Sequence, residues 1–200
     1  FKELPPGIMF SQSGVFLPSS AQKRIAFKTR NVKKVKLILS KIYANNLTQF
    51  FSEENLIGNA SNNNAKVNRC EREYDEEYDE YYERCNYGLN LDKIGDTILE
   101  KEFSVINEQN VWVQNEIDLS SIGDLSGIFI VELQFDKDSI DYTFEDMSDW
   151  RVSNFFRNYA KISKHLVFSN IALMAHQSER KFTLTALDIT RSTPLAGVPI

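Results

Sequence analysis

Short runs in which apolar and polar residues alternate dominate this chain, and they restrict its fold more than any other feature. The clearest run covers residues 127–135, where Phe129, Val131 and Leu133 alternate with Glu132 and Gln134. A period of two places every second side chain on the same face of a β-strand. Comparable short runs lie at residues 7–10, 14–18, 24–28, 35–40, 97–105, 111–117, 165–168, 170–175 and 182–186.

Outside the acidic segment described below, helical spacing occurs in two short stretches, at residues 45–51 and 151–157. A parallel sheet needs crossover connections of a dozen residues or more, usually helices, and no helix of adequate length is predicted here. We therefore predict an all-β fold, an antiparallel β-sandwich with short helices in its insertions, while a β-barrel stays open as the alternative. The side chains expected to pack inward rather than bind ligands are Phe16, Phe27, Leu37, Leu39, Phe129, Val131, Leu133, Phe182 and Leu184.

The pattern of strands and interruptions predicts two unequal domains. Residues 1–165 are expected to form the first sandwich, with an insertion at about residues 52–91 and a second polar loop at residues 136–150. Residues 166–200 are expected to be the first strands of a second, truncated β-domain. Because Phe1 is neither an initiator methionine nor part of a signal peptide, we expect the chain to be a piece of a longer protein. No window of about 18 apolar residues predicts a membrane span.

The acidity of the chain is concentrated in one segment. Between Cys70 and Cys85 lie eight acidic and two basic residues, a local charge of −6, and since the whole chain carries −5 the remainder is close to +1. Binding to DNA or RNA requires clustered Lys and Arg to neutralise phosphates. No nucleic-acid partner is therefore expected.

The two cysteines that bound this segment enclose 14 residues. In an oxidising compartment a disulfide between Cys70 and Cys85 would contribute about 3 kcal/mol by restricting the unfolded chain. The alternative is two free thiols in a cytosolic protein. A metal site is less favoured, because the pair lacks a third and a fourth ligand.

Tyrosines within the segment recur at the spacing of one helical face. A continuous helix would separate the two cysteines by about 22 Å, whereas a disulfide holds their Cα atoms within about 7 Å. With the bond formed, we expect a helix of about two turns. The candidate interaction loop comprises Tyr74, Tyr78, Tyr81 and Tyr82 with Glu76, Glu77 and Asp79. The competing interpretations are a solvated insertion, a weak Ca²⁺ site without EF-hand spacing, and, least favoured, a protease bait.

Catalytic motifs are missing from the sequence. His165 and His176 are expected at the surface or in a linker, without a Gly-x-Ser-x-Gly, His-Glu-x-x-His or phosphate-binding Gly loop nearby. Asp146 and Asp149 could share acid and base roles, but a polar loop of this composition is commonly only solvated. We predict no catalytic residues, no cofactor, no metal and no enzymatic activity.

Several segments resemble the macroglobulin-type (MG) domains near the front of bacterial alpha-2-macroglobulins, and they occur in the order of that family along most of the chain. The departures from the family are the acidic insertion and the loop at residues 136–150. The segments are residues 14–20 (GVFLPSS), 29–35 (TRNVKKV), 42–50 (IYANNLTQF), 127–131 (GIFIV), 168–173 (FSNIAL) and 194–198 (PLAGV).

This resemblance implies a scaffold domain of a protease trap, located in the periplasm or at the cell envelope, with a lipid anchor before Phe1 as an option. The implied partners are neighbouring MG domains and, through the full-length protein, host or competitor proteases. The family's reactive thioester uses a Cys-x-Glu-Gln motif, which neither Cys70 nor Cys85 begins. The alternative function is a fibronectin-like binding module of an envelope or adhesion protein that uses the acidic loop as its contact patch.

Overall fold

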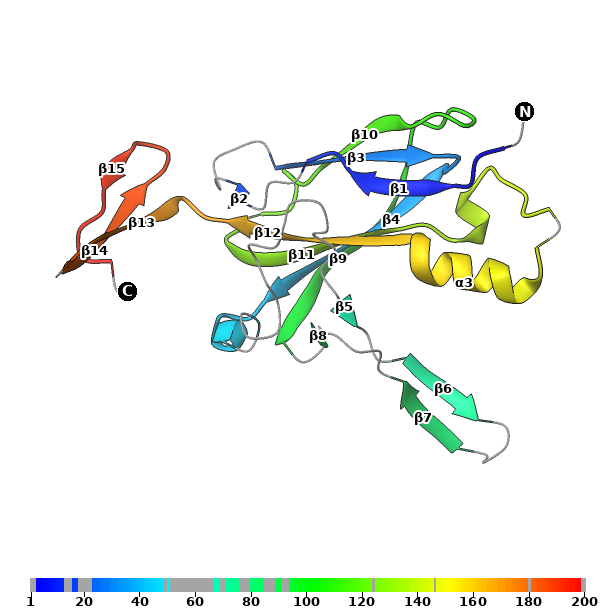
Figure 1. Ribbon diagram of the computed structural model, residues 1–200, viewed down its shortest axis with the longest axis horizontal. Helices are drawn as coiled ribbons and strands as arrows, with labels where there is room; N and C mark the ends of the chain where they lie inside the picture. The colour runs from blue at the N-terminus through cyan, green and yellow to red at the C-terminus, as the bar shows by residue number, and fades with distance from the viewer. Residues whose placement is uncertain are drawn as a thin grey trace.

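The computed structural model describes residues 3–12, 16–17, 23–48, 50, 67–68, 71–75, 80–84, 89–90, 94–123, 125–145, 147–179 and 181–198. Two sheets face each other in its main body (Figure 1). The three-stranded sheet is antiparallel and has the order β1 (Gly7–Phe10), β3 (Arg24–Arg30), β10 (Val113–Asp118). The five-stranded sheet has the order β2 (Phe16–Leu17), β12 (Lys161–Phe168), β11 (Gly127–Gln134), β4 (Lys34–Ile42), β9 (Gly95–Ser104).

The predicted sandwich is confirmed in this body. All neighbours in the five-stranded sheet are antiparallel except β2, which lies parallel to β12 over two residues. Six of the predicted core residues are fully buried between the sheets: Phe27, Leu37, Leu39, Phe129, Val131 and Leu133. Phe129 packs edge-on against Phe168 of the next strand, with ring centroids 5.4 Å apart. The side chain of the remaining first-domain core residue, Phe16, lies outside the described residues.

A buried asparagine ties the loops at one end of the sandwich together. Asn31, between β3 and β4, is 1% exposed and adopts a positive φ of 55°. Its side chain donates to the carbonyl oxygen of Leu4 (2.6 Å) and accepts from the backbone nitrogen of Asn110 (2.7 Å). Its own carbonyl accepts from the backbone nitrogen of Asp141 (3.0 Å). One residue thus connects the amino-terminal segment with two distant loops.

The loop at residues 136–148 and the helix that follows close the same end of the sandwich (Figure 1). The loop begins with the short helix η2 (Lys137–Ser139), and α3 (Asp149–Tyr159) runs directly into β12. Phe155 and Phe156 of α3 pack against Phe144, at centroid distances of 5.1 and 5.7 Å, and Phe156 also contacts Phe135 at 6.1 Å. These aromatic contacts explain why a polar-looking loop holds a defined position.

Two residues after β12 the chain enters a separate three-stranded sheet at the far end of the molecule (Figure 1). The sheet is antiparallel and consists of β13 (Ile171–Ser178), β14 (Lys181–Asp188) and β15 (Thr193–Pro194). The prediction that Phe182 and Leu184 pack inward is wrong in this structure, because they are 62% and 37% exposed. The alternation does place them on one apolar face, but no described element covers it.

The insertion contains strands rather than the predicted helix. β6 (Glu71–Asp75) and β7 (Glu80–Arg84) form an antiparallel hairpin in which Tyr74 pairs with Tyr81. Two further short strands, β5 (Val67–Asn68) and β8 (Leu89–Asn90), pair in parallel. Tyrosine favours strands, and the eight acids would repel one another at the i,i+3 and i,i+4 spacings of a helix. These two effects outweigh the helical spacing of the tyrosines.

Candidate functional site

The base of the insertion is anchored on the outer face of the five-stranded sheet, the face turned away from β1, β3 and β10. The chain leaves this face after the short helix η1 (Ala44–Asn46) and Phe50, and it returns at Ile94. Phe50 is fully buried and Ile94 is 1% exposed, and both belong to a second apolar cluster. This cluster is completed by Ile42, Ile128, Ile130 and Val167, with Leu47 against it. We call residues 44–48, Phe50 and Ile94 the insertion stem.

The two halves of the insertion stem are also joined through the backbone. The backbone nitrogen of Tyr43 donates to the carbonyl oxygen of Ile94 (2.9 Å), and that of Asn46 donates to Tyr43 (3.0 Å). A hydrogen bond to Asp96 raises the pKa of the exposed Tyr43 hydroxyl. The Tyr43 amide therefore reports on the contact between the two halves, and the Asn46 amide reports on the turn that begins the stem.

A buried polar row lies beside the apolar cluster on the same outer face. Glu132 of β11 is fully buried and forms an ion pair with Lys161 of β12. Ser163, opposite Glu132, is 4% exposed, and Ser40 is 1% exposed. At the edge of the row, the Ser40 hydroxyl lies 3.3 Å from that of the exposed Thr97. Polar groups in the centre of a covered sheet face are uncommon and need partners. Local sequence gives no sign of this burial.

His165 stands between the polar row and the apolar cluster. Its imidazole is 6% exposed and meets the ring of Phe50 edge-on, with centroids 5.3 Å apart and planes at 89°. Burial lowers the pKa of His165 to about 4. The prediction of a surface or linker histidine is therefore wrong for His165, whereas His176 is exposed, on β13.

The neighbouring Lys164 faces the opposite side of β12, toward the sandwich interior. It is 6% exposed, and its ammonium group donates to the carbonyl oxygen of Gln12 (2.6 Å) and lies 5.6 Å from the Phe10 ring centroid. Burial lowers the pKa of this lysine as well. Consecutive buried ionisable residues on opposite faces show that β12 is covered on both sides.

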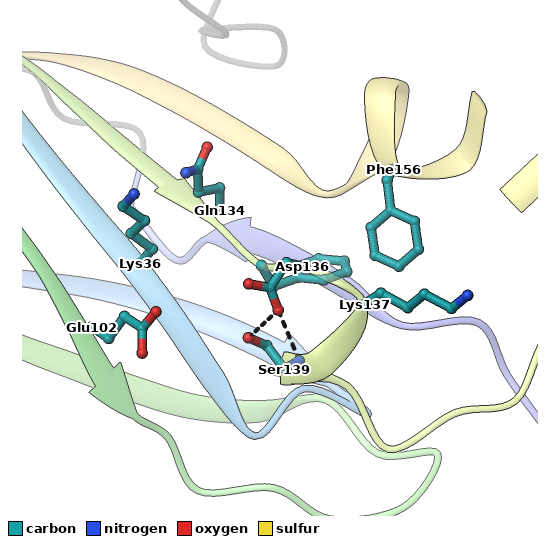
Figure 2. A pocket seen from close by; sticks show the side chains of 8 residues that line it. Lys36, Glu102, Gln134, Asp136, Lys137, Ser139 and Phe156 are labelled. Carbon is teal, nitrogen blue, oxygen red and sulfur yellow. Dashed lines mark hydrogen bonds between the residues drawn. The ribbon is translucent and has the colours of Figure 1, made fainter. Parts of the chain in front are cut away.

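A cavity of about 260 Å³ opens at the other end of the outer face, where β11 ends (Figure 2). Its lining residues are Lys36, Glu102, Gln134, Phe135, Asp136, Lys137, Ser139 and Phe156. Asp136 accepts hydrogen bonds from the backbone nitrogens of Asp138 (3.1 Å) and Ser139 (2.9 Å) and from the Ser139 hydroxyl (2.6 Å), so it caps η2. Lys36 forms an ion pair with Glu100 (2.5 Å). The lining holds neither a thiol nor an imidazole, and its carboxylates and ammonium groups are suited to holding a polar group rather than to nucleophilic chemistry.

The residues of the candidate interaction loop are placed only in part. Tyr74, Tyr81 and Tyr82 belong to the β6–β7 hairpin, which lies apart from both sheets (Figure 1). The other residues predicted for the loop and the disulfide lie outside the described residues: Cys70, Cys85, Tyr78, Glu76, Glu77 and Asp79. Glu71 pairs with Arg84, and these are the sequence neighbours of the two cysteines. The disulfide stays a prediction.

The other predicted arrangements of acidic and metal-binding residues lie only partly within the described residues. Asp149 is exposed in the first turn of α3, while Asp146 lies outside the described residues. Within the described ranges, no three His, Cys, Asp or Glu side chains are grouped as a metal site would require. In the same ranges, no helix has the length and apolarity to cross a membrane.

Comparison with known proteins gives a structural relationship only. No family model matches the sequence, and no curated protein matches it. The fold matches native alpha-2-macroglobulin from Escherichia coli spanning domains NIE-MG1, with a TM-score of 0.57 and 12% identity, over 95% of this chain and 73% of that one.

A second crystal structure of the same E. coli protein, spanning domains MG0-NIE-MG1, matches with a TM-score of 0.58 and 13% identity. The match covers 96% of this chain and 48% of that one. The native cryo-EM structure of E. coli alpha-2-macroglobulin gives a TM-score of 0.52 and 14% identity, over 92% of this chain and 9% of that one. The chain thus has the fold of these amino-terminal domains and spans a small part of the whole molecule.

Proposed function

We propose that this chain is a scaffold segment of a bacterial protein similar to alpha-2-macroglobulin, in which it positions neighbouring MG domains. The observation that carries the proposal is the fold match over 95% of the chain to the NIE-MG1 region. The described sites contain an anchored insertion, a polar cavity and an unpaired apolar sheet face, which suit a structural role. Protease capture would belong to the full-length protein, in the periplasm or at the cell envelope, with lipid anchoring as an option.

An inhibition assay tests whether protease capture depends on parts of the full-length protein other than this chain. A protease mixed with a molar excess of this chain is expected to retain its full activity on a protein substrate, whereas the full-length protein should reduce it. Inhibition by this chain alone would contradict the scaffold proposal. A pull-down that depends on residues 71–84, with the sandwich still folded, would favour the binding-module alternative.

The proposal also assigns the C-terminal sheet to a second domain that further strands complete. Leu173 on β13 and Phe182 on β14 share one face and are 60% and 62% exposed, with Leu184 between them at 37%. Isolated exposed apolar residues are ordinary, but a contiguous apolar face marks a contact surface. We propose that strands of the same domain cover this face in the full-length protein.

Serine substitutions in two contexts test this assignment. In the full-length protein, Leu173→Ser is expected to reduce the free energy of unfolding by about 3 kcal/mol, because it empties a buried site. In this chain the same change should cost little, because the side chain is already 60% exposed. Met174→Ser is the matched control. Met174 follows Leu173 on β13, so its side chain lies on the opposite face of the sheet, where it is 54% exposed. Equal effects of Leu173→Ser in both proteins, measured by urea unfolding, would refute the assignment.

A further inference from the structure

Both ends of the insertion are held on the sandwich by one apolar cluster. Its two ends, Phe50 and Ile94, lie in the same apolar cluster and are almost completely buried. His165 is the only imidazole beside this cluster in the part of the chain that the structure describes, and it touches Phe50 directly. A change in the charge of this one side chain therefore acts at the point where the insertion is attached.

Charged groups near His165 come from several strands. On the same strand, Lys161 lies four residues before His165 and on the same face, where it forms the ion pair with Glu132 of β11. Further along the outer face are Lys36 of β4 with Glu100 and Glu102 of β9, and Asp96 lies beside Tyr43. The described residues of η1 and those up to Thr48 carry no charged side chain. Phe50 presents an apolar ring to His165.

We infer that the contact between His165 and Phe50 is an acid-sensitive latch, which holds the insertion stem on the five-stranded sheet while His165 is neutral and releases it when His165 is protonated. The proton comes from solvent and is bound by an imidazole nitrogen, so no other reactant is needed. An imidazolium in this position is costly, because burial removes it from water.

The direction of the effect follows from the pKa in the two states. Burial lowers the pKa of His165 to about 4 when the stem is closed, and release into water restores it to about 6.5. The open state therefore binds more protons between these values, so closure is favoured fully above pH 6.5 and is weakened as the pH falls toward 4. From these two pKa values, the equilibrium constant for opening rises about 30-fold between pH 7.5 and pH 5.0.

Amide hydrogen exchange of the 200-residue chain, followed by NMR, tests the latch. The protection factors of the Tyr43 and Asn46 amides, corrected for intrinsic exchange, are expected to fall about 30-fold between pH 7.5 and pH 5.0. Amides of Phe27 and Phe129 in the sandwich core serve as references and should keep their protection. An equal fall in the references would show global unfolding and would overturn the inference.

Substitutions identify the group that titrates. His165→Phe keeps an aromatic ring, and His165→Gln keeps a polar side chain, and either should abolish the pH response of the two stem amides. His176→Gln, at the exposed histidine, and Asp96→Asn, at the carboxylate beside Tyr43, should leave it unchanged. A pH response that persists in both His165 variants would refute the latch. Should those variants fail to fold, ring NMR of the unmodified chain decides: a His165 midpoint below 5 supports the latch, and one near 6.5 overturns it.

Discussion

Replacing Asn31 by alanine is expected to reduce the free energy of unfolding by about 3 kcal/mol, because three stabilising features are lost together. The residue adopts a φ of 55°, which asparagine tolerates far better than alanine. Its side chain accepts from the backbone nitrogen of Asn110 and donates to the carbonyl of Leu4. In the alanine variant both backbone groups lose these partners at a site that is 1% exposed.

Two further substitutions at the same position separate these contributions. Asn31→Gly relieves the backbone conformation but removes the side-chain hydrogen bonds. It should therefore reduce the free energy of unfolding by less than Asn31→Ala does, but still measurably. Asn31→Asp keeps an acceptor for Asn110 and loses the donor to Leu4. Urea unfolding followed by tryptophan fluorescence provides the measurement, since Trp112 is half-buried near this end of the sandwich, with Arg30 over its ring at 4.8 Å. Stability unchanged in the alanine variant would contradict a structural role for this asparagine.

The sandwich strands could be predicted because alternation is a local property. A strand such as β11 shows its two faces within eight residues, and the six first-domain core residues with described side chains are all buried. The C-terminal sheet shows the limit of the same signal. Alternation correctly places Phe182 and Leu184 on one face of the sheet. It carries no information about which segment covers that face.

The burial of His165 and Glu132 could not be predicted from the same signal. Both residues lie on the outer face of the sheet, where polar residues are usually solvated. The contact that helps to bury His165 comes from Phe50, more than a hundred positions away in the sequence. The ion-pair partner of the buried Glu132, Lys161, lies on the neighbouring strand. The only local indication of this burial is a histidine beside apolar residues in the run at 165–168. The same pattern occurs in many strands that are half-exposed.

The tyrosines of the insertion show how two periodicities can coincide. Tyr74, Tyr78 and Tyr81 satisfy helical spacing, yet Tyr74 and Tyr81 are also equidistant from the centre of a hairpin and form a cross-strand pair. Spacing alone did not distinguish the two arrangements. The density of acidic residues, which disfavours a helix, was the more informative signal.

Replacing Gly95 by alanine is expected to reduce the free energy of unfolding by about 3 kcal/mol, because there is no room for a Cβ atom at the start of β9. A Cβ built on Gly95 would overlap the carbonyl oxygen of Lys41 and lie 3.1 Å from its carbonyl carbon. Both are backbone atoms of β4, so the strands must separate where Ile42 pairs with Gly95.

The same substitution should loosen the insertion stem, because Gly95 directly follows Ile94. Protection of the Tyr43 amide, whose acceptor is the Ile94 carbonyl, is expected to fall more than that of Phe27 in β3. Gly123→Ala is the matched control, since a Cβ there meets no atom within 4 Å and the change should alter stability by less than about 0.5 kcal/mol. Urea unfolding and amide exchange measure both quantities. If Gly95→Ala is as stable as Gly123→Ala, the close approach of β9 to β4 at this position is refuted, and with it the account of how the insertion is anchored.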